Sequence, residues 1–174
     1  MIGIKGVGMT ALAELLLAQG KIVTGSDTAE EFFTDAVLKQ LGISVRMFDA
    51  SAISTDIDLI IRSSAYGDDH AEVVAGRALG IPVHLYIDAV AEIFNAKRGI
   101  LVTGTHGKTT TTAMIGQVLE EAGFDPTVLV GEKVLKWGKN ARVGNGEWMV
   151  AEGDEYQEKF LKMKLISYSL KDGK

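Results

Sequence analysis

The chain has 174 residues, of which 47% are hydrophobic; it contains 20 glycines and no cysteine, and its formal net charge is −5. This length allows one large domain or two small ones, and the lack of cysteine excludes disulfides and thiolate metal sites. The negative charge opposes binding to nucleic acid or to an anionic membrane surface, and the first residues do not have the pattern of an export signal. We therefore expect a cytoplasmic α/β protein with no nucleic-acid and no membrane partner.

Strands and helices are expected to alternate along the first half, beginning with a glycine-rich turn at residues 3–8. Its glycines read G-x-x-G-x-G rather than the usual G-x-G-x-x-G, so the turn alone is a weak sign of nucleotide binding. The predicted elements around and after it are strand 1–4, helix 10–19, strand 21–25, helix 29–41, strands 43–47 and 58–62, helix 71–79, a strand from residue 80 and helix 87–94.

Two positions in this half lie where open parallel sheets bind ligands. Asp27 follows the second strand about twenty residues after the glycine turn, where an acidic residue typically contacts a ribose or a base edge. Alternatively, Asp27 caps the helix that is expected after Thr28. Ser63 follows the carboxyl end of the fourth strand, and its alternative is a capped turn into the next helix.

A second strand, glycine turn and helix begin near residue 100, after a polar stretch at residues 95–99 that we interpret as a domain boundary. Between Gly104 and Gly107 the backbone can direct N–H groups inward at a phosphate, and Lys108 adds a positive charge. Thr109 then stands where its hydroxyl can ligate Mg²⁺. The pattern is G-x-x-G-K-T, because Val102 occupies the first glycine position of the longer phosphate-binding form.

The alternative for this stretch is an ordinary strand, turn and helix with a surface lysine. Four consecutive threonines argue against it, since threonine is a poor helix former and a ligand that uses hydroxyls accounts for them better. Two nucleotide-type loops so far apart in the chain suggest two ligands.

The remaining pattern predicts helix 113–121, strand 127–130, a lysine- and glycine-rich connection at 131–145, strand 148–151, helix 158–164 and a half-exposed strand at 165–170. Glu152 follows the strand at 148–151, beside the phosphate loop. A carboxylate in that position can hold the Mg²⁺ that a nucleotide brings. The alternative is a solvated acidic turn.

Taken together, the motifs at residues 3–9, 25–27, 63–65, 104–112 and 152–155 resemble the Mur ligase family in both order and spacing. The resemblance implies a Rossmann-like UDP-sugar-binding domain at residues 1–98, followed at residues 99–174 by the first part of a P-loop ATP-binding domain. It also implies an ATP-dependent amide ligase of peptidoglycan precursor synthesis. The implied cofactors are ATP and Mg²⁺, and the implied substrates are UDP-N-acetylmuramate and an amino acid, with L-alanine favoured.

The resemblance also assigns roles to residues of this chain. The loop of Gly6, Val7 and Gly8 would lie near the UDP pyrophosphate, and Ser26, Asp27 and Ser63 would line the nucleotide-sugar site. The ATP phosphates would contact Gly104, Thr105, His106, Gly107, Lys108, Thr109 and Thr110. Thr109 and Glu152 would serve Mg²⁺, and Lys108 and Glu152 are the candidate catalytic residues.

Three features depart from the family pattern. Lys5 stands where the family usually has glycine, which either hinders approach to a pyrophosphate or adds charge to it. Residues 154–156 read Asp-Glu-Tyr instead of Asp-Glu-Ser, a variation also found in the related murein-peptide recycling ligase. The chain is less than half as long as family members, so we expect a fragment that is inactive in ligation on its own.

Three alternatives remain open at this stage. The chain could be a non-catalytic module that binds a UDP-sugar or nucleotide, or a recycling ligase of the same family. A nicotinamide-dependent oxidoreductase would use the first glycine turn but would leave residues 104–112 unexplained.

Overall fold

The computed structural model describes residues 1–153, and within them helices and strands alternate as an α/β protein, which confirms the predicted fold class. In chain order the elements are α1 (Val7–Ala18), β1 (Gly25–Asp27), α2 (Thr34–Gln40), β2 (Val45–Met47), the short 3₁₀ helix η1 (Ala50–Ala52), β3 (Ile60–Arg62), α3 (Ala71–Ala78), β4 (Val83–Leu85), α4 (Tyr86–Asn95), β5 (Arg98–Val102), α5 (Lys108–Glu121), β6 (Thr127–Val134), β7 (Lys139–Arg142) and β8 (Trp148–Glu152).

The first half forms a parallel sheet that is completed by one residue near the start of the chain. β1 pairs with β2 and β3 pairs with β4, all in parallel. Ile2 lies between the two pairs and bridges to Ser26 on one side and to Arg62 on the other. The predicted strand at residues 1–4 is therefore reduced to the single bridging residue Ile2, because Gly3 has a φ of 77° and already turns the chain.

The second half forms a four-stranded sheet in the order β5-β8-β6-β7. β5, β8 and β6 are parallel, whereas β7 runs antiparallel to β6. The predicted connection at residues 131–145 was wrong: β6 continues to Val134 and forms a hairpin with β7. The many lysines and glycines of this segment obscured the alternating pattern of a strand. In β7, Asn140 and Ala141 are buried, although their neighbours are polar.

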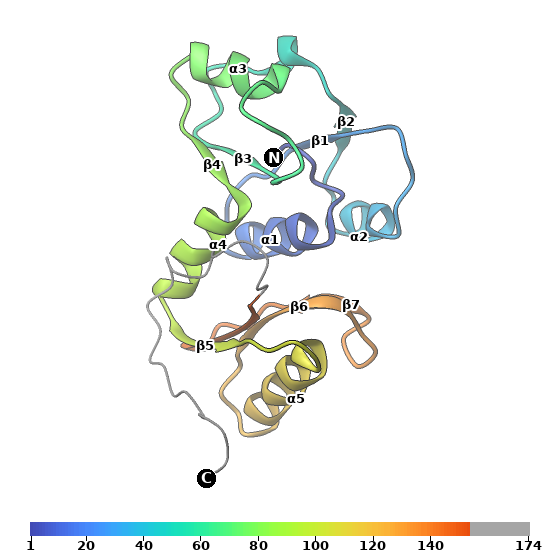
Figure 1. Ribbon diagram of the computed structural model, residues 1–174, viewed down its shortest axis with the longest axis vertical. Coiled ribbons are helices and arrows are strands. Elements are labelled where there is room, and N and C mark those ends of the chain that lie inside the picture. The colour runs from blue at the N-terminus through green and yellow to red at the C-terminus, as the bar shows by residue number, and fades with distance from the viewer. Residues whose placement is uncertain (154–174) are drawn as a thin grey trace.

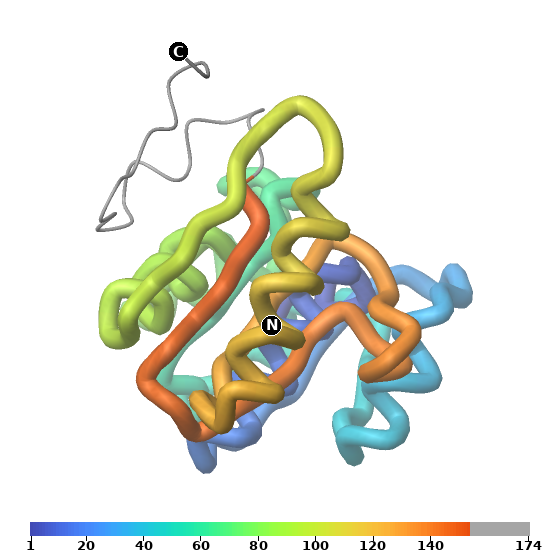
Figure 2. The backbone as a smooth tube through the Cα atoms, turned by 90° about the horizontal axis from the view of Figure 1, so that it is seen from below, coloured from blue at the N-terminus to red at the C-terminus, as the bar shows by residue number. Residues whose placement is uncertain are grey.

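Two helices lie between the sheets and belong to the core of both (Figure 1). α3 packs against one face of the first sheet, while α1 and α4 cover its other face. α1 and α4 also pack against β6, β7 and β8, and α5 covers the far face of this second sheet (Figure 2). The shared core contains Leu12, Val90, Phe94, Leu129 and Met149.

Three helices begin at places that differ from the sequence prediction, and the first of them, α1, begins at Val7 rather than at residue 10. α2 begins at Thr34 rather than at residue 29, because the carbonyls of Thr28 and Glu30 accept hydrogen bonds from Lys5 and hold that segment out of a helix. α5 begins at Lys108 rather than at residue 113. Gly107 has a left-handed conformation and turns the chain directly into the helix. This local geometry outweighs the low helix propensity of the four threonines.

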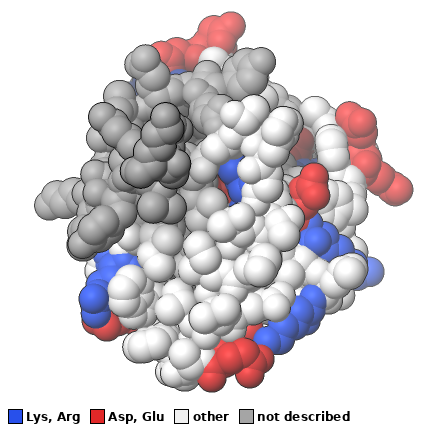
Figure 3. Space-filling view, turned by 60° about the horizontal axis from the view of Figure 1, so that its bottom comes forward, with Lys and Arg blue, Asp and Glu red and all other residues white. Residues whose placement is uncertain are grey.

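The outer side of α5 exposes apolar side chains, including Met114 and Val118. Where Figure 3 shows described residues, the face is largely uncharged, with lysine, arginine and acidic side chains mostly towards its edge. Among the helices of residues 1–153, none is long and apolar enough to cross a membrane.

Candidate functional site

The loop between β5 and α5 has the backbone geometry that a phosphate-binding turn needs. Gly104 and Gly107 have φ values of 145° and 76°, which side-chain-bearing residues rarely adopt. Lys108 is the first residue of α5, and its Nζ donates to the Gly104 carbonyl at 2.6 Å. The half-buried Thr109 follows it. Because the 14-residue helix begins here, its first N–H groups and the lysine face the same turn.

The other predicted residues of this loop are open to solvent. Thr105, His106 and Thr110 are exposed, and His106 has no contact that separates it from an ordinary turn residue. Figure 2 shows the loop arching beyond the carboxyl end of β5.

Glu152 stands at the carboxyl end of β8, directly beside the start of this loop, because β8 pairs with β5 and places Glu152 opposite Val102. Its Oε2 accepts from the Gly131 N–H at 2.5 Å. Its Oε1 is buried and has no hydrogen-bond partner among the described residues. Since a buried carboxylate oxygen is costly unless a donor or a cation satisfies it, this oxygen fits a divalent cation.

A cavity of about 250 Å³ joins this loop to the first glycine turn. It is lined by Val7, Gly8, Tyr86, Ile87, Val90, Lys108, Leu129, Val130, Gly131, Ala151, Glu152 and Gly153. The sequence suggested two ligands for the two loops, and their number stays a prediction. The structure places Gly8 and Lys108 on the wall of the same cavity.

The first glycine turn approaches this cavity closely. Gly6 precedes α1, which begins at Val7, so N–H groups of the helix start lie beside the turn. A Cβ at Gly8 would come within 2.9 Å of the Tyr86 hydroxyl oxygen, and glycine therefore lets the turn pack against this ring. Burial raises the pKa of Tyr86 to about 12, so its phenol is neutral at physiological pH.

Ser26 and Asp27 lie at the carboxyl end of β1, but both are buried and already have protein partners. Ser26 donates to the carboxylate of the fully buried Glu72. Asp27 accepts from the N–H groups of Lys5, at 2.7 Å, and Thr28, at 2.8 Å. Asp27 thus fastens the glycine turn to β1; it does not cap a helix, because α2 starts further on, and its contact with a ribose stays a prediction.

Ser63 lies half-buried after β3, as predicted, and its Oγ accepts from the Ala65 N–H at 3.3 Å. This contact closes a local turn but does not cap α3, which begins at Ala71, so the capping alternative is wrong. It leaves the hydroxyl hydrogen available, and the role of Ser63 in binding a sugar nucleotide also stays a prediction.

Lys5 does not point at a phosphate site. Only 8% of the residue is exposed, and its Nζ donates to the Thr28 carbonyl at 3.1 Å and the Glu30 carbonyl at 2.7 Å. It also forms an ion pair of 3.2 Å with Asp35. The suggestion that Lys5 adds charge to the glycine turn is therefore wrong, since its charge is compensated by Asp35 in the first turn of α2.

The sequence interpretation missed several residues of the site. Tyr86 had no motif to mark it. Gly131 could have been found, because a glycine next to a buried apolar run often marks a close approach. It lies within β6, and a Cβ there would lie 2.6 Å from Glu152 Oε2. The predictions for residues 154–156, 158–164 and 165–170 lie outside the described residues.

Two family models match the chain: the Mur ligase family, catalytic domain, at residues 1–98 and the Mur ligase middle domain at residues 102–164. The chain therefore belongs to the Mur ligase family.

Similar proteins and structures come from the same family. The UDP-N-acetylmuramate–L-alanine ligase of Desulfitobacterium hafniense (strain Y51) is 47% identical over 161 residues, which are 92% of this chain and 36% of that protein. The structure of UDP-N-acetylmuramate-alanine ligase from Thermotoga maritima matches with a TM-score of 0.83 and 36% identity, over 93% of this chain and 38% of that one.

A third match is the UDP-N-acetylmuramate:L-alanyl-gamma-D-glutamyl-meso-diaminopimelate ligase from Neisseria meningitides, with a TM-score of 0.80 and 31% identity, over 89% of this chain and 52% of that one. The chain spans about a third of the length of the curated relatives it matches.

Proposed function

We propose that this chain provides the sugar-nucleotide site and the ATP-phosphate site of a cytoplasmic ligase that joins L-alanine to UDP-N-acetylmuramate. In this proposal residues 1–98 bind the UDP-sugar and residues from 99 onward bind Mg²⁺-ATP. The observation that carries it is the single cavity lined by Gly8 of the first turn and by Lys108 and Glu152 beside the second. Transfer of a phosphoryl group requires that its donor and acceptor meet in one place.

The proposed reaction converts a carboxylate, which is a poor electrophile, into an acyl phosphate. The lactyl carboxylate of UDP-N-acetylmuramate takes the γ-phosphoryl group and ADP leaves; the amine of L-alanine then forms the amide as phosphate departs and the amine loses a proton. Negative charge spreads over the oxygens of the migrating group. The Lys108 ammonium and the N-terminus of α5 would stabilise this charge.

Glu152 and the Thr109 hydroxyl would hold Mg²⁺, with the unpartnered Oε1 of Glu152 as the first ligand. When bound, Mg²⁺ neutralises charge on the phosphate oxygens. The neutral Tyr86 phenol beside Gly8 would bound the space left for the lactyl group.

Calorimetric titration of the 174-residue chain with UDP-N-acetylmuramate and, separately, with Mg²⁺-ATP tests the proposal. We expect one equivalent of each ligand to bind. UTP, which lacks the amino sugar, and Mg²⁺-AMP, which lacks the transferable phosphates, serve as matched controls. Failure of both principal ligands to bind would contradict the proposal, and binding of NAD⁺ in their place would favour the oxidoreductase alternative.

A further inference from the structure

One buried amide connects the two halves of the protein next to the cavity. Asn140 lies on β7 and is only 4% exposed. Its Nδ2 donates to the Val7 carbonyl at 3.1 Å and to the Val130 carbonyl at 3.4 Å. Val7 is the first residue of α1, in the first glycine-rich stretch, whereas Val130 lies in β6. One side chain therefore connects β7 both to its neighbouring strand and to a residue 133 positions earlier in the sequence.

The chemistry of this contact is specific for an amide. The NH₂ group of asparagine has two hydrogens, and here each can serve one carbonyl oxygen. Aspartate has the same shape but offers only acceptor oxygens when ionised, and alanine leaves both carbonyls without this donor. Asn140 therefore acts through hydrogen bonding rather than by filling space alone.

The same contact leads to the carboxylate of the site. The residue after Val130 is Gly131, whose N–H donates to Glu152 Oε2 at 2.5 Å. Val7, Val130, Gly131 and Glu152 all line the 250 Å³ cavity. A shift of β6 relative to α1 would thus change the distance between the glycine turn and Glu152.

The neighbouring residue of β7, Lys139, makes a second polar contact with α1. Lys139 forms an ion pair with Glu14 of α1, and both side chains are at least partly buried. Figure 1 shows β6 and β7 running alongside α1. The hairpin is accordingly fixed to α1 at two successive residues.

We infer that Asn140 is a positioning residue, which sets the spacing between the first glycine turn and Glu152 across their shared cavity and so couples ligand binding at the two loops. The coupling rests on the proposed function, whereas the spacing itself does not. Asn140 is not placed in contact with either ligand.

Hydrogen–deuterium exchange of the ligand-free chain tests the spacing for wild type, Asn140→Ala, Asn140→Asp and Thr127→Val. The last variant is the matched control, because Thr127 is equally buried in the same sheet and its hydroxyl donates to the Gly144 carbonyl at 3.0 Å, within the second half. We expect both Asn140 variants to raise exchange about tenfold at residues 3–10 as well as at 128–132. Thr127→Val should raise exchange only within residues 124–146.

Equal exchange patterns in Asn140→Ala and Thr127→Val would overturn the inference, since they would show a general loss of stability. Unchanged exchange at residues 3–10 in Asn140→Asp would overturn it as well.

Calorimetry with both ligands adds a readout of coupling. In wild type, saturating Mg²⁺-ATP should change the affinity for UDP-N-acetylmuramate about fivefold or more, and this factor should approach one in Asn140→Ala. A factor that survives the substitution would refute the coupling. If wild type binds neither ligand, the proposed function fails, and the exchange experiment still decides whether Asn140 sets the spacing.

Discussion

Lys108 is the residue on which the proposed ATP site depends most. It begins α5, and its Nζ lies 2.6 Å from the carbonyl of Gly104 in the turn that the sequence singled out. This position gives the turn a positive charge at the helix N-terminus, where anions are already favoured. The positive φ angles of Gly104 and Gly107 could be predicted, because a pair of glycines beside a lysine indicates a turn that other residues cannot form.

The substitution Lys108→Ala should weaken binding of Mg²⁺-ATP roughly 10- to 100-fold, the loss expected for a charge-assisted hydrogen bond. The affinity for UDP-N-acetylmuramate should stay nearly unchanged, because the predicted contacts of that ligand belong to the first half. Calorimetry would measure both affinities, with Lys39→Ala, an exposed lysine of α2, as the control. Equal loss of both ligands would contradict this division of roles.

Other residues of the site show where sequence reasoning stops. Asp27 was correctly expected at the end of a strand after the glycine turn. Its partners, the N–H groups of Lys5 and Thr28, could not be predicted, because spacing does not tell whether a carboxylate faces a ligand or the backbone. The burial of Lys5 was equally hidden, since it depends on carbonyls more than twenty residues away.

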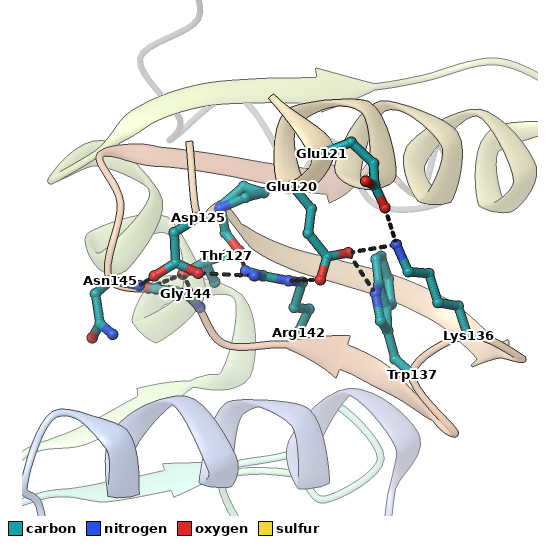
Figure 4. A network of polar contacts seen from close by, with 10 residues as sticks. Glu120, Glu121, Asp125, Thr127, Lys136, Trp137, Arg142, Gly144 and Asn145 are labelled. Carbon is teal, nitrogen blue, oxygen red and sulfur yellow. Dashed lines mark hydrogen bonds and ion pairs between the residues drawn. The ribbon is translucent and has the colours of Figure 1, made fainter. Parts of the chain in front are cut away.

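At the scale of elements, the end of α5 is tied to the β6–β7 hairpin by a polar network (Figure 4). Arg142 contacts Asp125 at 2.8 Å and Glu120 at 3.1 Å. Glu120 also accepts from Trp137 at 3.3 Å and pairs with Lys136 at 3.2 Å. This network fixes the far end of the helix whose first residue is Lys108.

The network makes stability depend on pH in a defined direction. The Asn145 N–H and then Arg142 lower the pKa of Asp125 below its usual 3.8. For Glu120, desolvation raises the pKa, but hydrogen bonds from Trp137, Arg142 and Lys136 have a larger opposite effect and lower the pKa below 4.5. A carboxylate with a lowered pKa binds fewer protons in the folded than in the unfolded state. It therefore stabilises the folded state fully above its usual pKa, and this contribution is lost as the pH falls through the lowered pKa.

Accordingly, the free energy of unfolding of wild type should fall as the pH is lowered from 5 through the usual carboxylate range, and Arg142→Met should show a smaller fall. Urea denaturation at a series of pH values would measure this, with Lys39→Met as the control. A pH dependence in Arg142→Met as steep as in wild type would show that the network does not hold these pKa values down.

Most elements could be located from the sequence, and the failures have physical causes. Hydrophobic periodicity placed α3, α4 and the buried strands, because their apolar residues face one core. The hairpin of β6 and β7 was not predicted, since Gly131, Glu132, Lys133, Lys136 and Gly138 are exposed around its turn and its buried Asn140 is polar. The start of α5 escaped because threonine preference was given more weight than the turn that precedes it.

At the scale of the whole molecule, a large hydrophobic core cluster is shared by the two halves. α1 and α4 belong to the first half in sequence, yet they bury Leu12, Val90 and Phe94 against Leu129 and Met149 of the second sheet. This contact could not be foreseen, because the pattern of an amphipathic helix gives its apolar face but not the sheet that covers it. The division at residue 98 is proposed for ligand binding, and this shared cluster crosses it.

A shared core predicts that the halves unfold together. Leu12→Ala should lower the free energy of unfolding by about 2–5 kcal/mol, as for other buried leucines. Both tryptophans, Trp137 and Trp148, lie in the second half, so their fluorescence should shift to lower denaturant as far as circular dichroism does. Val118→Ala, at an exposed position of α5, is the control. A tryptophan transition that stays in place while circular dichroism shifts would mean separate unfolding.

In the proposed function the two nucleotide loops serve one cavity. The most direct test is the effect of Mn²⁺-ATP on the proton resonances of UDP-N-acetylmuramate bound to this chain. Mg²⁺-ATP gives the diamagnetic reference. We predict strong relaxation of the lactyl methyl protons and much weaker relaxation of the uracil protons, because the metal at Glu152 and the reacting carboxylate would lie at the same end of the cavity. Relaxation that is equal at both groups, or absent although both ligands bind, would contradict the shared site.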